Sequence, residues 1–308
     1  MCAEAMLRLV DLRKRFGKSV ALDGVSLTIG PGEVFGYLGP NGAGKTTTIR
    51  LLMGMLRPTS GRAEILGRDC WRQPVEVHKQ VGYVPGDPAL YDRLTGRHHV
   101  AYCFHLRHHA DWKRAEELAS RLDLDLDVPV KTLSRGNKQK LAVVLAMMSR
   151  PRLLVLDEPT SGIDPLVQQV FHTLLREHTA DGGAVLLSSH VLGEVERVAD
   201  RIGVVRRGRL VAVERLQDLA ARSLHRVRAS FAEDIAGTDY EGLPGVRDVV
   251  VNQRTMSCSA PQSSLDALLK RVSQRQVVDF ECAEAPLEET FLSYYGSEYM
   301  VNGDAGAH

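Results

Sequence analysis

The sequence has few of the features that mark secreted, membrane-spanning or nucleic-acid-binding proteins. Its five cysteines are scattered without a Cys-x-x-Cys pair, which argues against a disulfide framework and indicates a reducing compartment. No apolar run approaches the roughly 18 residues that a membrane helix needs, and the N-terminus lacks the pattern of a secretion signal. A net charge of +1 gives no reason to expect nucleic acid. We therefore expect a cytoplasmic protein whose membrane contacts, if any, are made through a partner.

The charge that is present is unevenly distributed. Residues 223–308 hold 7 Lys and Arg against 13 Asp and Glu, a net charge of −6, which leaves +7 for residues 1–222. This asymmetry predicts two units with different partners, and 308 residues are enough for both. A basic first unit would suit a phosphate ligand, although an ordinary soluble surface explains +7 equally well.

Strands alternate with helices in residues 1–222. Period-2 alternation and short apolar runs predict strands, residues 47–56 predict a helix, and residues 87–150 are mostly helical by pattern. The expected strands lie within residues 6–16, 20–29, 32–39, 152–159 and 184–190, followed by a hairpin over 202–214. This alternation predicts an α/β fold whose sheet is covered on both faces.

Residues 223–308 predict a small α+β domain. Strands are expected at 226–232, 246–252, 255–260 and 277–283, with a helix over 263–274. If the stretch before Leu243 holds a helical turn, the order is that of a ferredoxin-like unit. A final helix over 286–296 carries a stripe of Leu287, Phe291 and Tyr294, which we interpret as core rather than as a ligand site.

The strongest local signal is the segment GPNGAGKT, which fits G-x-x-x-x-G-K-[ST] between an expected strand and an expected helix. Its glycines let the backbone curl so that N–H groups surround phosphate oxygens. Lys45 would neutralise the β- and γ-phosphates, and the Thr46 hydroxyl would ligate Mg²⁺. A nucleotide site is therefore predicted at Gly39, Pro40, Asn41, Gly42, Ala43, Gly44, Lys45, Thr46 and Thr47.

Two acids and a histidine follow strands that end near this loop. Asp157 closes an apolar strand, where it could hold Mg²⁺ through water, and Glu158 comes next, where it could activate a water molecule as a general base. His190 ends another strand. The alternatives are two solvated acids and a structural histidine.

The segment LSRGNKQK precedes the apolar run LAVVLAMM, which predicts a helix beginning near Ser134. A helix start exposes unpaired N–H groups and the positive end of the dipole, so Ser134, Arg135 and Gly136 could seat an anion. The alternative is a helix N-cap formed by Ser134 with nothing bound.

In order and spacing, these elements resemble the ATP-binding-cassette (ABC) transporter ATPases over about residues 6–222. The resemblance implies a P-loop NTPase fold with a RecA-like sheet core and a helical subdomain over about 87–150. It implies that Ser134 and Gly136 face the γ-phosphate of ATP held by the opposite subunit of a head-to-tail dimer, and Arg135 between them keeps donors compatible with phosphate. It also implies that Phe16 stacks on adenine, that His190 stabilises the γ-phosphate, and that residues 161–164 communicate across the dimer.

Three residues depart from the family pattern. Arg135 stands where the signature normally has glycine, and Asn137 where it has glutamine. Gly86 replaces the glutamine that normally reaches Mg²⁺ and relays its state to the membrane subunit. We leave open whether water or Asp87 substitutes for it.

The stretch HHVAYCFHLRHH holds five of the eleven histidines. On a helix His105 and His109 would share a face as a metal pair, but no acid lies inside the stretch, so a solvated or partner-facing segment is the favoured interpretation.

The signature variant, the PG loop at residues 85–86 and the segment PLEETFLSYYG resemble the ATP-binding proteins of bacterial multidrug-type (ABC-2) exporters. This resemblance implies an ATPase on the inner face of the cell membrane, acting with a separate transmembrane permease and a second ATPase subunit, with a homodimer favoured and no nucleic acid. The alternatives are a soluble ABC ATP-switch protein of translation or DNA repair, and an importer ATPase.

Overall fold

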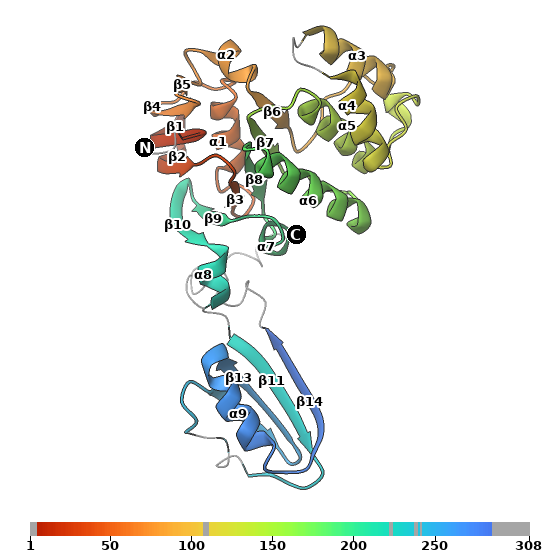
Figure 1. Cartoon of the computed structure of the whole chain (residues 1–308). Helices are drawn as coiled ribbons and strands as arrows, with labels where there is room; N and C mark the ends of the chain where they lie inside the picture. Colours follow the sequence, from red (N-terminus) through yellow and green to blue (C-terminus); the bar gives the residue numbers. More distant parts are fainter. Residues whose placement is uncertain (1–4, 107–110, 222–223, 237–239, 241, 285–308) are drawn as a thin grey trace, which may run out of the picture. The chain divides into compact units, whose positions relative to one another are not determined.

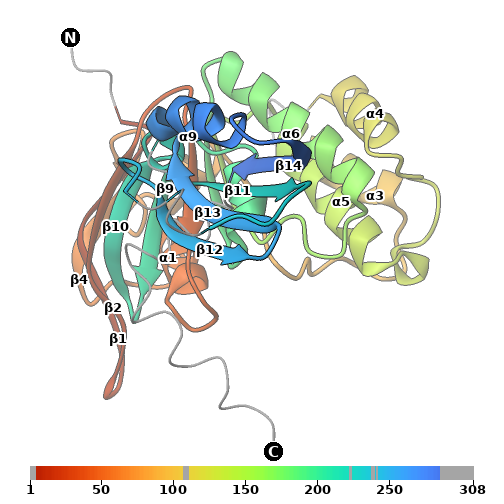
Figure 2. The same cartoon turned by 90° about the horizontal axis from the view of Figure 1, so that it is seen from below.

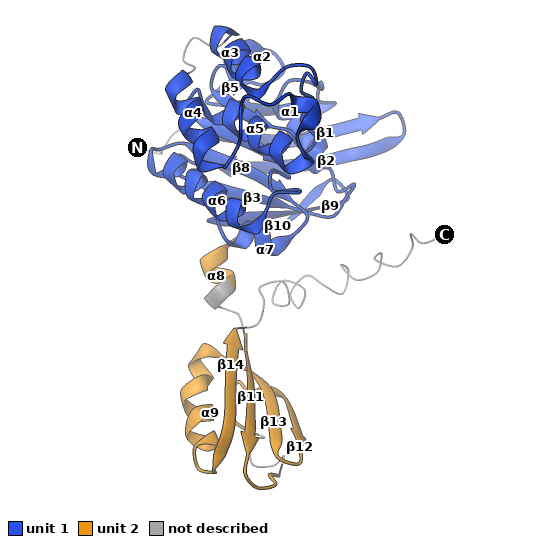
Figure 3. Ribbon diagram, turned by 90° about the vertical axis from the view of Figure 1, so that its right-hand side faces the viewer, with its two compact units in different colours: residues 1–214 blue, residues 215–308 orange. Residues whose placement is uncertain are grey.

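The chain divides into two compact units, residues 1–214 and 215–308 (Figures 1 and 3). The computed structural model describes residues 5–106, 111–221, 224–236, 240 and 242–284. Sequence patterns placed the boundary at 222, whereas the contacts within the chain assign helix α8 (Leu216–Ala221) to the second unit. Among the described residues, no helix is both long and apolar enough to cross a membrane.

The first unit is built on a six-stranded sheet with the order β10-β9-β3-β8-β7-β6. Its inner strands pair in parallel, β3 with β8 and β9, and β7 with β6 and β8. The strands are β3 (Val34–Leu38), β6 (Val81–Val84), β7 (Leu153–Asp157), β8 (Ala184–Ser189), β9 (Arg201–Arg206) and β10 (Arg209–Arg215). Because parallel strands share one direction, the carboxyl ends of β3, β7 and β8 meet at the same edge of the sheet.

A second, antiparallel sheet has the order β2-β1-β4-β5. Its strands are β1 (Leu7–Phe16), β2 (Ser19–Ile29), β4 (Ser60–Ile65) and β5 (Arg68–Asp69). Leu7 and Ile29 of this sheet share one apolar cluster with Phe35 of β3 and Ile49 of helix α1 (Lys45–Leu52). This cluster covers one face of the central sheet.

Helices cover the other face. Val34, Leu154 and Leu187 of the central strands share a second cluster with residues of α4, α5 and α6. Besides α1, the helices in the described part of this unit are α2 (Pro74–His78), α3 (Gly96–Leu106), α4 (Trp112–Arg121), α5 (Arg135–Met147), α6 (Pro165–Ala180) and α7 (Leu192–Glu196), with a 3₁₀ turn at Val130–Thr132. In Figure 2 the strands β1, β2 and β4 and the helices α4 and α5 lie on opposite sides of the unit. The predicted sheet covered on both faces is confirmed.

The second unit holds a four-stranded antiparallel sheet with the order β12-β13-β11-β14. Its elements are β11 (Leu224–Phe231), β12 (Arg247–Asn252), β13 (Thr255–Pro261), a 3₁₀ turn (Gln262–Ser264), α9 (Leu265–Val272) and β14 (Val277–Glu284). This is the strand order of the ferredoxin-like unit that the sequence predicted. The described residues between β11 and β12 form no helix, so the expected helical turn is not among them. The helix expected over 286–296, with Leu287, Phe291 and Tyr294, lies outside the described residues.

Candidate functional site

The loop Gly39–Thr46 joins β3 to α1 and curls as the sequence predicted. Gly44 has a φ of 111°, and a Cβ there would lie 2.8 Å from the carbonyl oxygen of Ala21. Gly39 is equally confined, because a Cβ there would collide with the carbonyl oxygen of Val205. Only glycine fits these two positions, so the loop keeps its shape without a ligand. Of the other predicted loop residues, Pro40, Asn41, Gly42 and Thr46 are exposed, Thr47 is half-buried and Ala43 is buried.

Lys45 begins α1, and its side chain is buried against its own loop. Its Nζ donates to the carbonyl oxygens of Gly39 at 2.7 Å and Pro40 at 3.4 Å. The same ammonium lies 3.6 Å from Oε1 of Glu158. A cation held by neutral carbonyls and one carboxylate can exchange these partners for a more strongly charged phosphate.

Asp157 lies at the carboxyl end of β7, where it is 5% exposed. Its Oδ1 accepts a hydrogen bond of 2.6 Å from Oγ of Ser188 on the neighbouring strand β8. A buried carboxylate needs such a donor, because an unpaired charge is strongly disfavoured away from water. The sequence-predicted acid is therefore fixed in place at the loop edge of the sheet.

Glu158 follows Asp157 in an unusual conformation. Its φ of 47° is left-handed, and its N–H donates to both O and Oγ of Ser188, at 3.1 and 3.2 Å. The carboxylate turns toward Nδ1 of His190, 3.1 Å away, as well as toward Lys45. The structure thus brings together Lys45, Glu158 and His190, three residues from separate parts of the chain.

Sequence reasoning missed Ser188. Two serines precede His190, and the chain alone does not say which of them faces the acids. The register of the parallel strands pairs Asp157 with Ser188, whereas the hydroxyl of Ser189 donates to Glu194 at 2.8 Å. The only signal in the sequence is a small hydroxyl residue at the end of a buried strand.

The signature segment starts helix α5. Ser134 is its N-cap, and its Oγ accepts the N–H of Asn137 at 3.2 Å. The side chain of Arg135 is exposed, whereas Gly136 is buried. A Cβ at Gly136 would collide with the carbonyl oxygen of Gly162, so residues 161–164 pack directly on the helix start. In the described chain no hydrogen bond or ion pair joins Ser134, Arg135 or Gly136 to the Gly39–Thr46 loop.

The loop after β6 contains Gly86. A Cβ at this glycine would lie 3.3 Å from the backbone oxygen of Asp157, so the loop passes close to the acid. The buried Gln139 of α5 donates through Nε2 to the carbonyl oxygen of Pro85 at 3.2 Å, and this bond ties the loop to the signature helix. Asp87 is exposed, and no ion pair of its carboxylate is found within the described residues.

Phe16 lies at the end of β1, and the residue is 49% exposed. Nζ of Lys14 lies 4.9 Å from the ring centroid. An exposed ring beside a cation is available to stack on a planar ligand.

The described part of the histidine-rich stretch, residues 98–106, lies on α3. His105 uses Nδ1 in a 2.7 Å contact with the carbonyl oxygen of Ala101, and the buried His99 accepts the N–H of Tyr91 at 3.0 Å. His109 lies outside the described residues. Within the described chain no group of three or more His, Cys, Asp and Glu side chains is placed to hold a metal ion.

Comparisons with known proteins identify this arrangement. The family model described as ABC transporter matches residues 22–161. The uncharacterized ABC transporter ATP-binding protein YcbN of Bacillus subtilis (strain 168) is 32% identical, over 96% of this chain and 96% of its own. The chain belongs to the ABC transporter family. The Nod factor export ATP-binding protein I of Ralstonia nicotianae (strain ATCC BAA-1114 / GMI1000) is 32% identical to this ABC chain, over 95% of it and 94% of the relative.

The fold of this ABC chain agrees with solved structures. The structure of an ATP binding subunit of an ABC transporter superimposes on it with a TM-score of 0.66 and 30% identity, covering 70% of this chain and 92% of that one. The predictions of an ABC ATPase, of its P-loop α/β fold and of ATP binding and hydrolysis are confirmed. ABC ATPases dimerise and work with transmembrane subunits.

Proposed function

We propose that this chain is the ATP-hydrolysing subunit of a membrane exporter. It acts with a separate transmembrane permease and a second ATPase subunit, preferably its own copy, at the inner face of the cell membrane. The observation that carries the catalytic part is the cluster of Lys45, Glu158 and His190 at the edge of the sheet beside the P-loop. The relative named for Nod factor export, which matches both units of the chain, supports export over import.

The P-loop residues Gly39–Thr47 hold the phosphates of ATP. Their N–H groups, at a helix start, face the anion, and Lys45 exchanges its bond to the Gly39 carbonyl for the β- and γ-phosphates. The exposed ring of Phe16 stacks on adenine. Together these contacts bind the nucleotide at both ends.

The residues beside the P-loop fit a magnesium ion. Hydroxyl and carboxylate oxygens are the donors that Mg²⁺ prefers, and the chain offers the exposed Thr46 hydroxyl and the Asp157 carboxylate. Ser188 bonds to one oxygen of Asp157 and orients it. When bound, Mg²⁺ neutralises phosphate charge.

Glu158 takes the proton of the attacking water. Its backbone N–H donates to Ser188, which holds the residue in place, and its carboxylate lies 3.6 Å from the ammonium of Lys45. General-base catalysis of this kind is typically worth about 10²–10⁴ in rate. His190 contacts Glu158 through Nδ1, and in the imidazolium form, with a proton on each nitrogen, it would also donate from Nε2 to the γ-phosphate.

Ser134, Arg135 and Gly136 complete the site of a second copy. They lie at the start of α5, where free N–H groups and the dipole favour an anion, and within one chain nothing in the described part joins them to the P-loop. A head-to-tail dimer would bring the signature of each copy to the γ-phosphate of the other. A homodimer is favoured because one chain carries both Glu158 and the signature.

The decisive experiment is a mild-detergent pull-down of Glu158→Gln from native cells with ATP present. We expect a polypeptide with several membrane spans to co-purify. Measuring the direction in which that protein moves its substrate would then distinguish an exporter from an importer. Recovery of a surface binding protein with it would instead indicate an importer. Ribosomes, DNA-repair factors or the absence of any membrane protein would contradict the proposal and favour a soluble ATP switch.

A further inference from the structure

A pocket of about 500 Å³ lies at the edge of the central sheet opposite the nucleotide site. Its walls come from the segments that lead into β7 and β8, namely residues 150–152 and 181–183, together with Arg114 of α4 and His178 of α6. The same two strands end in Asp157 and Ser189 at the other edge. The pocket therefore shares no residue with the P-loop, the acids or the signature.

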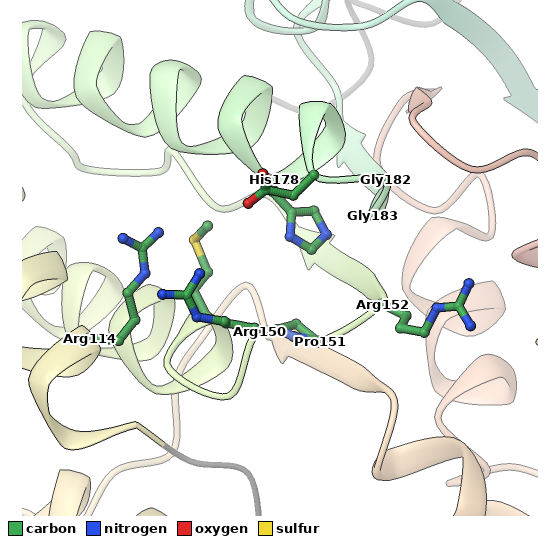
Figure 4. Close-up of a pocket in the computed structure, with 9 residues that line it drawn as sticks. Arg114, Arg150, Pro151, Arg152, His178, Gly182 and Gly183 are labelled. Atoms are coloured by element: carbon green, nitrogen blue, oxygen red, sulfur yellow. The ribbon is translucent and has the colours of Figure 1, made fainter.

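The pocket is lined by positive charge. In Figure 4 the side chains of Arg114 and Arg150 extend into the space that faces His178, whereas the guanidinium of Arg152 points away. Arg150 is exposed and forms no ion pair within the described residues. Asp181 is the one carboxylate in the lining that the structure describes. Two guanidinium groups converging on one space provide the fork-shaped donors that suit oxyanions.

Two buried nitrogen atoms in this lining have no hydrogen-bond partner of good geometry. One is Nε of Arg114, whose Nη1 meanwhile donates to Glu117 at 2.7 Å. The other is Nε2 of His178, whose ring packs on the bare backbone of Gly183, where a Cβ would collide with it, and also interacts with the backbone of Ala184. Protein atoms cover both nitrogens, so a ligand in the pocket would meet the terminal nitrogens of the Arg114 and Arg150 guanidinium groups instead.

We propose that this pocket is a second anion site, which takes a phosphate group without using the nucleotide site. Its volume lies in the range of small-molecule sites and leaves room for a phosphate ester larger than the ion itself. Arg114 and Arg150 bind the oxygens of the phosphate, and the His178 ring closes the pocket on the other side. The phosphate can belong to a soluble compound or to the headgroup of an anionic lipid.

The test measures phosphate binding through the NMR signal of an arginine side chain in the pocket. Glu158→Gln protein is saturated with Mg-ATP, so that the γ-phosphate position of the P-loop is filled, and inorganic phosphate is added while the ¹⁵N signal of Arg114 Nε is recorded. We expect a saturable shift of this signal, which Arg114→Lys identifies by its loss. Arg150→Gln should weaken phosphate binding about tenfold, because it removes a charged donor.

Arg152→Gln is the matched control. Arg152 lines the same pocket and is also exposed, but it points away, so we expect less than about a twofold change in affinity. Glu117→Gln, which frees the guanidinium of Arg114 from its ion pair, should tighten binding. No shift of the Arg114 signal, or equal losses for Arg150→Gln and Arg152→Gln, would overturn the proposal.

A second arm distinguishes the two sources of phosphate. Vesicles of phosphatidylcholine with phosphatidylglycerol are compared with vesicles of phosphatidylcholine alone. If the anionic vesicles displace inorganic phosphate from Arg114, the site takes a lipid headgroup. If phosphate binds and neither vesicle displaces it, the site takes a soluble phosphate compound.

Discussion

The hydroxyl of Ser188 donates a hydrogen bond of 2.6 Å to Oδ1 of Asp157. The same hydroxyl oxygen accepts the backbone N–H of Glu158, the next residue. One side chain on β8 thus fixes both acids that end β7. The left-handed φ of Glu158 is an unfavourable conformation for a residue with a side chain, and this anchoring stabilises it. The position of both acids depends on the register between two strands.

Ser188→Ala tests this anchor. We expect ATP turnover to fall about tenfold, with a higher Mg²⁺ concentration needed for half-maximal activity, because a charged hydrogen bond to Asp157 is lost. The matched control is Ser189→Ala, a change of equal size on the same strand whose hydroxyl bonds Glu194 instead. Turnover measured against Mg²⁺ concentration separates the two variants. Equal losses in both would assign Ser188 a purely structural role.

Glu158→Gln tests the general base. The amide keeps the size of the side chain but cannot accept a proton, so we expect ATP binding and stable dimers with hydrolysis slowed about 10²-fold or more. Nucleotide affinity, size-exclusion chromatography and phosphate release provide the measurements. Normal turnover in this variant would place the base elsewhere.

Gly136→Ala tests the close approach at the signature. The added Cβ would meet the backbone oxygen of Gly162, which cannot move away as a flexible side chain could. We expect ATP-driven dimerisation to be lost and the free energy of unfolding to fall by about 1–3 kcal/mol. Gly193→Ala, where no atom lies within 4 Å, is the control and should leave dimerisation unchanged. Dimers of normal stability in Gly136→Ala would show that the loop at 161–164 can shift to make room for the added Cβ.

Arg135→Gly tests the unusual signature. Arg135 is exposed and arginine supplies donors compatible with phosphate, so we expect the ATP concentration for half-maximal dimerisation to change, by up to about tenfold, without loss of function. Light scattering at increasing ATP concentration measures it. Loss of ATP-driven dimerisation in this variant would contradict the expectation.

The cysteines should differ in reactivity with pH. Burial raises the pKa of Cys70 to about 12 and of Cys258 to about 11, so both stay neutral thiols near pH 8, while Cys282 is exposed. We expect iodoacetamide at pH 8 to modify Cys282 in the folded protein, and to reach Cys70 and Cys258 only as the pH approaches those values or after unfolding. Mass spectrometry of digested protein locates the label. Early labelling of Cys70 would mean that its part of the core opens readily.

Much of the site could be predicted because its chemistry is encoded locally. The P-loop glycines, Lys45 and the acids after an apolar strand are defined by their own neighbours in sequence. Ser188 could not be found in this way, because strand register selects it, and neither could the close packing of Gly162 on Gly136 within the loop at 161–164. The pocket that Arg114, Arg150 and His178 line could not be predicted either, because three distant segments of the chain supply these residues.

The strand order also determines when the site can form during synthesis. Strand β8 lies between β3 and β7, yet it is made about 140 residues after Lys45. At ordinary rates of translation this delay is on the order of ten seconds. Until Ala184–Ser189 enters the sheet, the P-loop strand and the strand with both acids have no neighbour that holds them together. A nascent chain shorter than this cannot close its nucleotide site, and its buried strands stay available to chaperones.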